Sequence, residues 1–588
     1  LAWRDVILRE DPDIVMGYNV TGFDYPFLFH RAKECDCLEE FLLLSRRRGE
    51  ICATLDYSTK EYMLPTTKTR VATGEYILSD IPMTGRLMID MLNWFRRSDT
   101  SLESYSLDSV SGIYIGDSIT EVVSTNEGNT QLSTRNLKGI EVGSYVHLYV
   151  SGHSRSLYIS EDERSKFKVL EVSAAGKYII IEGLETPLAG KTVWGLAKDD
   201  ITPQDIFRLT NEGPAERALV AKYCVQDCAL VANLFQKVDV ITELVEMSRL
   251  TSVPMSYLIS RGQGIKLLSF LAKDCRKRGY IIPVIAKGKK TDAYEGAIVL
   301  PPKCGIYLDD AIGIGDFASL YPMSMQSENL CVSSKVWTQT FDLDNNFVEE
   351  TGETGIDADG NRYFIYDNLP DYEYVTREFD TYMWIWNPAA PKQKPKKVKT
   401  GRRVCRFAKH RNGELAVFPS VLKELVQARR DCRKQIPMQT DDFRKNLLDK
   451  RQLSYKLVCN SLYGLCGAKT SAFYDIDIAA STTAVGRMCL LYAKAILEAC
   501  YQNTRVQTSA GPMDVTAEYV YGDTDSVFFM LHMTCAVTQR KIKGKELLAL
   551  TIEVSDEACK LVTQFLKTPH DFEYEKTFQP FLLLSRKR

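Results

Sequence analysis

The chain has 588 residues, enough for several domains, and its 45% hydrophobic and 26% charged residues are typical of a globular protein. A formal net charge of −2 excludes a general polyanion binder, so any nucleic-acid contact has to be local. No apolar run approaches the ~20 residues of a membrane span and no signal peptide is present, so we expect no membrane contact. The 16 cysteines include no C-x-x-C pair, which argues against zinc and disulfide sites and favours a reducing, intracellular setting.

Both ends of the chain read as interior sequence. Leu1–Glu10 begins without methionine and resembles the middle of a helix. The last residues, Leu582–Arg588, are apolar and then basic, with no closing turn. We therefore expect an internal fragment of a longer protein.

The first half of the chain contains two kinds of pattern. Residues 1–116 alternate apolar and amphipathic stretches, as an α/β domain does, and residues 199–285 return to helical periodicity. Between them, residues 117–198 have strand patterns around glycine turns, most clearly in Val142–Val150 and Phe167–Leu184. The sequence therefore predicts a small β-barrel inserted into an α/β domain.

A second region begins near residue 286. The apolar runs Ala297–Leu300 and Ile312–Phe317 predict short strands, and the acidic, glycine-rich stretch Phe341–Arg362 predicts an exposed hairpin. Lys392–Arg403 holds seven basic residues in twelve. That run is either a solvated loop or a contact to a DNA backbone.

The last third of the chain predicts long helices and one clear hairpin. The helical patterns cover Ser420–Ile436, Asp441–Leu465 and Ser481–Ala499. Two apolar strands joined by a short polar tip cover Glu518–Leu531. The second region is therefore expected to be α+β.

Three carboxylates stand out against this background. Asp523 and Asp525 lie at the tip of the apolar hairpin, where the simpler interpretation is a turn. Two acids this close repel each other, and a divalent cation would relieve the repulsion. Asp316 ends the predicted strand Ile312–Phe317. If that strand lies beside the hairpin, the three acids meet and hold two magnesium ions suited to phosphoryl transfer.

Cations and aromatic residues gather on two predicted helices. Arg429 and Arg433 are spaced i, i+4, and Lys456, Asn460 and Tyr463 follow i, i+4, i+7 spacing, so each set shares a helix face. A solvated basic face is one interpretation, and a triphosphate site is the other. The sequence has no P-loop, so a triphosphate would be held by helix cations and metal.

These segments, taken together, resemble the B-family DNA polymerases. Asp316–Pro322 resembles motif A, with Met323 in place of the usual serine, and Tyr521–Ser526 is similar to motif C. The other matching segments are Lys456–Gly464 (motif B), Tyr294–Ala297 (the Y-x-G-G/A linker), and Tyr574–Lys576 with Ser585–Arg588 (the K-K-R-Y region, ending before its tyrosine). The matches are in order and cover most of the chain.

The resemblance implies a role for each matched position. Asp316 and Asp525 would ligate two magnesium ions, or manganese ions in their place, helped by the Phe317 carbonyl, with a weaker part for Asp523. The other implied roles are triphosphate binding by Lys456, Arg429 and Arg433 with support from Asn460, exclusion of a 2′-hydroxyl by Tyr321, packing of Tyr463 at the nascent base pair, and primer or DNA contacts by Lys587 and Glu575.

The front domain resembles the 3′–5′ exonuclease domain of the same family. Gly17–Pro26, which contains Asn19 and Asp24, is similar to the second exonuclease motif, and Tyr223 with Asp227 is similar to the third. Asp24 and Asp227 would hold metal, and Tyr223 would orient the attacking water. The D-x-E motif that precedes these in the family is absent here, so the exonuclease set is incomplete.

The resemblance also implies a fold and a setting. We expect a ribonuclease-H-like α/β exonuclease domain (1–116 and 199–285) with the β-rich insertion (117–198). A palm of antiparallel sheet and helices (286–415 and 471–588) and helical fingers (416–470) would follow, without a thumb. Details of the motifs and the insertion favour the branch of delta-like polymerases and large eukaryotic DNA viruses.

Three functions compete at this stage. They are an active DNA polymerase, a catalytically inactive relative with a structural role, and a nuclease alone. The intact polymerase motifs favour the first. Its expected partners are primer–template DNA, deoxynucleoside triphosphates and a sliding clamp or other processivity factor. Its expected location is the nucleus or a viral replication site in an infected cell.

Overall fold

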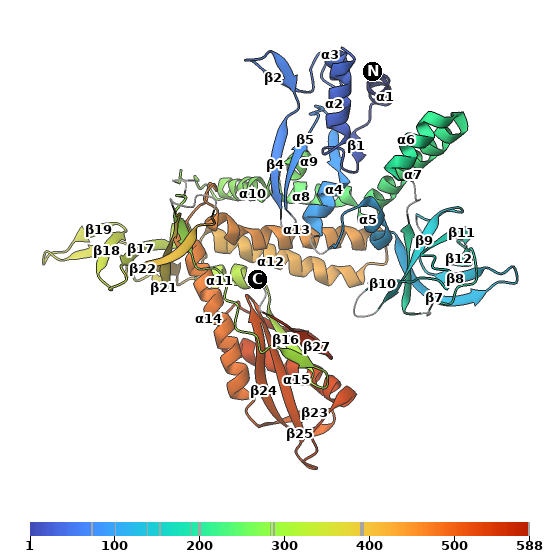
Figure 1. Ribbon diagram of the computed structural model, residues 1–588. Helices are drawn as coiled ribbons and strands as arrows, with labels where there is room; N and C mark the ends of the chain where they lie inside the picture. The colour runs from blue at the N-terminus through green and yellow to red at the C-terminus, as the bar shows by residue number, and fades with distance from the viewer. Residues whose placement is uncertain are drawn as a thin grey trace. The chain divides into compact units, whose positions relative to one another are not determined.

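The computed structural model describes residues 1–71, 74–99, 102–137, 139–151, 155–187, 190–197, 202–282, 284–285, 288–387 and 393–585. The chain divides into two compact units (Figure 1). The first is Leu1–Val245 with Pro254–Ser260, and the second is Glu246–Val253 with Arg261–Arg588. The helix α10 (Gln263–Lys277) thus belongs to the second unit, whereas the expected exonuclease domain extended to residue 285.

The first unit begins with an α/β arrangement. Strands β1 (Ile14–Gly17) and β6 (Leu87–Asp90) pair in parallel, with Gly17 opposite Asp90. Large apolar side chains such as Phe29 and Leu44 form its core. The other elements here are α1 (Ala2–Glu10), α2 (Asp24–Glu34), α3 (Leu38–Phe41), α4 (Met91–Ser98), α5 (Leu107–Tyr114), and the hairpins β2 (Thr54–Asp56)–β3 (Glu61–Met63) and β4 (Thr66–Val71)–β5 (Gly74–Ser79).

The predicted β-barrel is present in the first unit. Its strands are β7 (Gly116–Ser124), β8 (Thr130–Thr134), β9 (Tyr145–Ser151), β10 (Arg155–Leu157), β11 (Lys166–Ser173), β12 (Tyr178–Ile181) and β13 (Thr192–Ala197). β13 pairs with both β7 and β9, which closes the sheet on itself. Phe167 and Trp194 fill the interior, and Trp194 donates to the Thr134 hydroxyl at 3.0 Å. The entry and exit strands are neighbours, because Gly116 lies opposite Gly195.

Helices follow the barrel, as the periodicity predicted. They are α6 (Pro203–Glu212), α7 (Pro214–Val238), α8 (Val240–Thr251) and α9 (Met255–Ser260). By length and composition alone, α7 is a helix that could cross a membrane. The sequence analysis did not find it, because charged residues such as Lys222 and Asp227 interrupt its apolar run. One such helix is weak evidence, since core helices of soluble proteins have the same composition.

The main sheet of the second unit is five-stranded and antiparallel. Its order is β23 (Thr504–Thr508), β24 (Gly511–Asp523), β25 (Ser526–Cys535), β16 (Ile312–Phe317) and β26 (Phe572–Phe578). The helices α14 (Ile476–Cys500) and α15 (Gly544–Phe565) share a hydrophobic core with this sheet. That core contains Phe317, Phe529 and Phe572. The predicted hairpin over Glu518–Leu531 is the central part of β24 and β25.

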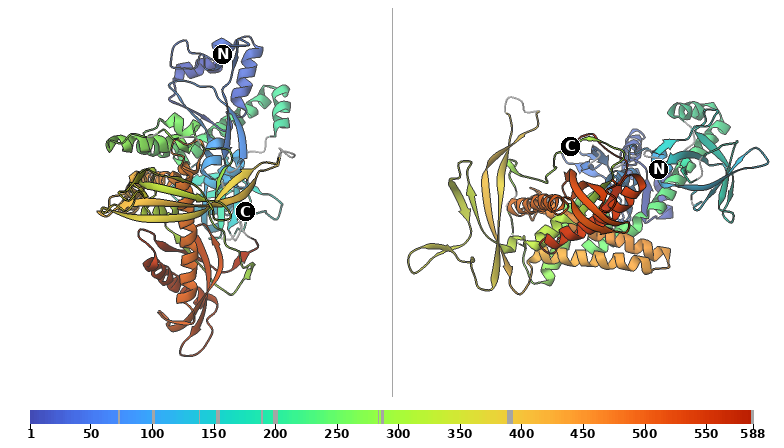
Figure 2. Two further views of the ribbon diagram at one scale, coloured as in Figure 1. Left: turned by 90° about the vertical axis from the view of Figure 1, so that its left-hand side faces the viewer. Right: turned by 90° about the horizontal axis from the view of Figure 1, so that it is seen from below.

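A second five-stranded sheet lies in the same unit. Its order is β14 (Asp292–Tyr294), β21 (Tyr372–Ile385), β22 (Lys396–His410), β17 (Lys335–Phe341) and β18 (Phe347–Thr351). Figure 2 shows β21 and β22, in yellow and amber, as long strands side by side. The single hairpin predicted over Phe341–Arg362 is instead two, because β17 pairs with β18, and β19 (Thr354–Ile356) pairs with β20 (Arg362–Phe364).

The basic run Lys392–Arg403 is largely a strand, so its interpretation as a solvated loop is wrong for residues 396–403. Four of its cations have partners inside the unit, namely Lys397 with the Tyr294 carbonyl (2.6 Å), Lys399 with Asp380 (2.8 Å), Arg402 with Glu378 (3.1 Å) and Arg403 with Asp477 (2.8 Å). Within the described part of the run, Lys394 and Lys396 remain exposed without an ion pair, and Lys392 lies outside the described residues. A DNA-backbone contact by this run remains a prediction.

Helices α12 (Val417–Gln435) and α13 (Asp442–Gly467) form a packed pair joined by a short turn, η2 (Ile436–Met438). A connection this short makes them antiparallel neighbours. The strand predicted over Ala297–Leu300 is not formed. Val299 makes an isolated bridge to Asp523 there. The remaining elements are α11 (Leu320–Ser327), η1 (Val332–Ser334), and β15 (Gly305–Tyr307), which pairs with β27 (Phe581–Leu583).

Candidate functional site

Asp316 lies near the end of β16, the strand between β25 and β26. Alternate residues of a strand face opposite sides. A side chain on Gly315 would meet the Phe572 ring at 2.4 Å and the Cys559 sulfur at 2.9 Å, so α15 and Phe572 pack directly on the backbone there. Asp316 points to the other side, where it lies opposite Ser526 of β25. The I-G-I-G-D sequence thus puts two glycines on the tightly packed side of the strand, and Asp316 on the other side, after the buried Ile312 and Ile314.

Asp525 occupies the turn between β24 and β25, next to Asp316. Thr524 has a left-handed backbone (φ 59°), which closes the turn. The Phe317 amide donates to the Asp525 carbonyl at 2.9 Å. Asp523 begins the turn and accepts a 2.9 Å hydrogen bond from the Thr524 hydroxyl. The backbone bond ties the end of β16 to the tip of the hairpin, so the two acids of different segments are neighbours.

The pKa of Asp316 is raised by its surroundings. Burial raises the pKa of Asp316 to about 7, and Asp525, Glu575 and Glu573 add to the rise, while Lys456 opposes it. Two of these acids are on β26, where Glu573 is the direct cross-strand neighbour of Asp316. The sequence analysis missed Glu573. The sequence feature that could have identified it is the alternation of aromatic and acidic residues at the start of Phe572–Phe578, which predicts a strand with Glu573 and Glu575 on one face.

The residues fit a divalent metal in one respect. Within the described residues, no group of three or more His, Cys, Asp or Glu side chains is arranged to hold a metal by itself. Magnesium, however, usually binds through one or two carboxylates together with substrate phosphates. Asp316 and Asp525 supply such a pair, and a bound cation would remove the repulsion that raises the pKa of Asp316.

The predicted triphosphate cations lie on the two packed helices. Arg429 on α12 is half-buried, and its Nε donates to Gln452 of α13 at 3.3 Å. Burial and the nearby Arg433 lower its pKa, and Glu573 opposes this. Lys456 on α13 is exposed and lowers the pKa of Asp316. Both cations therefore interact electrostatically with acids of the main sheet, Arg429 with Glu573 and Lys456 with Asp316.

Arg433 and Asn460 are the other two residues predicted to act on the triphosphate. Both side chains are exposed on their helices, one turn away from Arg429 and Lys456 respectively. The structure gives neither one a hydrogen bond or ion pair within its described part. Arg433 lies on the same face of α12 as Arg429, and Asn460 lies on the same face of α13 as Lys456.

Three tyrosines form a compact group beside the acids. The rings of Tyr321 on α11 and Tyr463 on α13 are 4.5 Å apart between centroids. The Tyr463 and Tyr294 hydroxyls are 3.0 Å apart. Burial, followed by Asp525, raises the pKa of Tyr321 to about 12. A side chain on Gly486 of α14 would meet the Tyr321 ring at 2.9 Å, so the helix backbone is in contact with that ring.

The two predicted DNA contacts are Glu575 and Lys587. Glu575 is exposed on β26 and pairs with Lys576 at 2.8 Å. It occupies a bulge in the pairing of β26 with β16, which separates it from the regular register. Lys587 lies outside the described residues. Their roles on primer DNA remain predictions.

The first unit places the predicted exonuclease residues around a loop. Asn19 has a left-handed backbone (φ 63°), and its amide donates to Asp90 at 2.9 Å. Burial raises the pKa of Asp24, and Asp90 adds to the rise. Asp24 and Asp227 both raise the pKa of the Cys228 thiol, after burial. Cys228 thus feels the charge of both Asp24 on α2 and Asp227 on α7, and Tyr223 is buried on α7.

Asp90 is a functional candidate that the sequence analysis missed. Besides Asn19, its carboxylate accepts from the Thr21 hydroxyl at 2.6 Å and from Asn93 at 2.9 Å. It also caps α4 by accepting from the Leu92 amide. The signal was an acid that ends an apolar strand, Leu87–Asp90. Asp90 fixes the loop that precedes Asp24.

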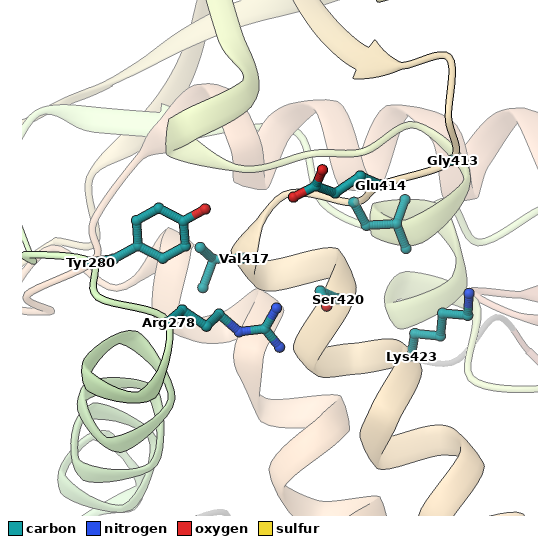
Figure 3. A pocket seen from close by; sticks show the side chains of 8 residues that line it. Arg278, Tyr280, Gly413, Glu414, Val417, Ser420 and Lys423 are labelled. Atoms are coloured by element: carbon teal, nitrogen blue, oxygen red, sulfur yellow. The ribbon is translucent and has the colours of Figure 1, made fainter.

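Two pockets lie away from these sites. One of about 210 Å³ opens at the start of α12, where Arg278, Tyr280 and Lys423 are among its lining residues (Figure 3). The other, of about 370 Å³, lies beside the Glu246–Arg451 ion pair. Neither is lined by a predicted catalytic or nucleotide-binding residue.

Comparison with known proteins decides the family. The model of "DNA polymerase family B" matches residues 253–588, more than half of the chain. The chain belongs to DNA polymerase family B. The model of the family's exonuclease domain matches residues 1–110. Neither B-family model covers residues 111–252, which contain all seven strands of the barrel.

Individual relatives agree. The chain is 44% identical over 585 residues to a "DNA polymerase" of Phaeocystis pouchetii virus, covering 99% of this chain and 55% of that protein. It is 34% identical to a "DNA polymerase" of Pyramimonas orientalis virus (100% and 46% covered) and 26% identical to the "DNA polymerase delta catalytic subunit" of Dictyostelium discoideum (100% and 39%). The chain therefore spans about half the length of the curated relatives it matches.

A solved structure supports the fold. The family B DNA polymerase of the hyperthermophilic archaeon Pyrobaculum calidifontis matches with a TM-score of 0.52 at 19% identity, over 100% of this chain and 51% of that one. The expected order of an exonuclease domain followed by a palm region is confirmed, as is the likeness to viral and delta-type B-family polymerases.

Proposed function

We propose that the full-length protein extends a DNA primer along a template by nucleotidyl transfer at the Asp316–Asp525 pair. The observation that supports this most directly is the 2.9 Å hydrogen bond from the Phe317 amide to the Asp525 carbonyl, which places Asp525 beside Asp316. Burial, and after it Asp525, raises the pKa of Asp316 to about 7, so a bound divalent ion would stabilise the ionised pair. Family membership supports the reaction class.

In this proposal, Asp316 and Asp525 hold the divalent metal, magnesium or manganese, and the Phe317 carbonyl assists. The bound metal would supply positive charge at the transferring phosphoryl group. Lys456, Arg429 and Arg433 neutralise the triphosphate of the incoming deoxynucleotide. The primer 3′-hydroxyl attacks the α-phosphate, and pyrophosphate leaves. The chain contributes mainly by positioning and by charge neutralisation.

The tyrosine group supplies sugar and base-pair selection. Tyr321 would lie under the deoxyribose and exclude a 2′-hydroxyl, and Tyr463 would pack at the nascent base pair. The contact of their rings at 4.5 Å supports this division, because a rigid aromatic surface presents a fixed shape to the substrate. Asn460 would support the triphosphate, and Asp523 would act indirectly on the metal. Glu575 and Lys587 would contact the primer.

Partners and location follow from the same proposal. Primer–template DNA and deoxynucleoside triphosphates are the substrates, and a sliding clamp is the expected processivity partner. The reaction would take place in the nucleus or at a viral replication site. Exonuclease activity is not included, because Asp24 and Asp227 are the only metal-holding carboxylates that the sequence analysis identified for it.

A primer-extension assay of the full-length protein tests the polymerase proposal. We expect Asp525→Asn to lower the extension rate by roughly 10³-fold or more, since it removes a metal-binding carboxylate from the reacting centre. Asp344→Asn is the matched control, because Asp344 is an exposed acid in the turn between β17 and β18. Undiminished extension by Asp525→Asn would reject the metal assignment and, with it, the proposed reaction centre.

A further inference from the structure

Arg487 on α14 holds a short segment of backbone next to the tyrosine group. Its Nη1 donates to the carbonyls of Glu295 (3.1 Å) and Gly296 (2.8 Å), and its Nη2 pairs with the Glu295 carboxylate at 3.2 Å. The Arg487 side chain is only 14% exposed. A planar guanidinium suits such a set of acceptors, since its donors are held in a fixed fork.

Two more side chains hold the same segment. Lys397 of β22 donates to the Tyr294 carbonyl at 2.6 Å, and Thr483 of α14 donates to the Glu295 carbonyl at 2.7 Å. Each of the three consecutive carbonyls from Tyr294 to Gly296 therefore has a side-chain donor. Loop backbone is usually satisfied by water or by turns, so three donors from two elements indicate a segment that is fixed in position.

The fixed segment includes Tyr294, which belongs to the tyrosine group. Tyr294 reaches Tyr463 through the 3.0 Å contact of their hydroxyls, and the Tyr463 ring packs at a tilt of 38° against the Tyr321 ring. Helix α14 also touches this group directly, because Gly486, the neighbour of Arg487, packs against the Tyr321 ring. The guanidinium is close enough to lower the pKa values of both Tyr321 and Tyr463, against the larger rise that burial causes.

We propose that Arg487 is a positioning residue for sugar selection. It fixes the Glu295–Gly296 backbone, which sets the Tyr294 hydroxyl against Tyr463 and so keeps the Tyr321 ring in place. The inference rests on the proposed function, in which Tyr321 excludes the 2′-hydroxyl. Loss of Arg487 loosens the ring and lets ribonucleotides enter, while the metal-binding acids and the triphosphate cations are untouched.

The experiment measures kcat/KM for a deoxynucleotide and for the matching ribonucleotide in the full-length protein. Arg487→Gln should lower the ratio of the two roughly tenfold, the effect of losing hydrogen bonds from a charged donor. The change should appear as a lower KM for the ribonucleotide, with kcat for the deoxynucleotide within about twofold of the unchanged protein. Arg487→Lys should be intermediate, because an ammonium group can retain a carbonyl bond.

Glu295→Gln is the matched control. It removes the ion pair and leaves both carbonyl bonds of Arg487 in place, so the ratio should stay within about twofold of the unchanged protein. If Arg487→Gln does not fold, Tyr294→Phe takes its place, since it removes the hydroxyl contact with Tyr463 alone and should also lower the ratio.

Tyr321→Ala separates the two levels of the proposal. If it abolishes sugar discrimination while Arg487→Gln, or Tyr294→Phe in its place, leaves the ratio unchanged, the positioning role is wrong and the proposed function stands. If Tyr321→Ala itself leaves sugar discrimination unchanged, Tyr321 does not select the sugar, and the positioning role of Arg487 is then wrong as well. A drop in the ratio for both supports the inference.

Discussion

At the scale of single residues, Asp316 combines two opposing requirements. In the proposed function its carboxylate has to be ionised to bind metal, yet burial and the neighbouring acids favour the protonated form. The folded-state pKa of about 7 lies above the ordinary value of 3.8. The folded protein therefore binds this proton more tightly than the unfolded chain does. The stability that this supplies is full below about pH 4 and is lost as the pH rises through 7.

Asp316→Asn tests this balance. In the absence of divalent ions at pH 8, we expect the variant to unfold about 2 °C higher than the unchanged protein, because an ionised, repelled carboxylate is gone. At pH 4 the two proteins should unfold together. Thermal melts at both pH values provide the measurement, with Asp309→Asn, an exposed acid nearby, as control. A variant that is less stable at pH 8 would contradict the sign.

Single residues also show what the sequence could and could not predict. Asp316 and Asp525 were predictable as candidates because an acid at the end of an apolar strand and an acid in an apolar hairpin are unusual on chemical grounds. Glu573 was not, since its importance comes from the cross-strand partner that folding gives it. Arg403 was expected in a loop or on DNA, and it is instead paired with Asp477, which lies 74 positions away in sequence.

At the scale of elements, β16 connects the core to the site. Its glycines let α15 and Phe572 approach the backbone, while the opposite side presents Asp316. The strand was predicted at its observed bounds, because its run is apolar and ends sharply. The glycine spacing had no evident meaning in sequence, since the close approach of α15 is a tertiary contact. Ala297–Leu300 was predicted as a strand from composition alone, and it forms only an isolated bridge, from Val299 to Asp523 at the end of β24.

Gly315→Ala tests the tight packing behind Asp316. The added methyl would lie 2.4 Å from the Phe572 ring, so we expect a loss of about 1–3 kcal/mol in the free energy of unfolding. Primer extension should fall as well, because the strand has to shift. Gly264→Ala is the control, since Gly264 lies at the start of α10 with open space around it. Denaturant unfolding measures both, and equal stability of the two variants would contradict the packing argument.

At the scale of the whole molecule, the β-barrel is the part that family membership explains least. It is a closed sheet with its own interior, and the strand pattern of residues 117–198 was sufficient to predict it. The division into two compact units was less predictable. Its boundary falls within continuous helical sequence, at residues 245–261, where no change of composition marks it.

Removal of the barrel tests its independence. Residues 117–194 can be replaced by a short glycine–serine linker, because Gly116 and Gly195 are paired neighbours. We expect the shortened full-length protein to fold and to retain primer extension within about threefold, as insertions that leave and return at one place are tolerated. Circular dichroism and the extension assay measure this outcome. An insoluble or inactive product would show that the barrel supports the rest of the protein.

The two-sided character of β16 has a consequence for how this enzyme can change over time. The interior face of α15 packs against the backbone of β16 that carries Asp316. Substitutions on that face can therefore shift Asp316 although they lie behind the strand. On that face, Ser555 and Cys559 are what a side chain on Gly313 and on Gly315, respectively, would meet. Under the proposed function, changes selected by nucleotide-analogue drugs or low magnesium should therefore accumulate at these two positions as well as at the residues proposed to contact substrate. A map of resistance drawn only around the nucleotide would overlook them.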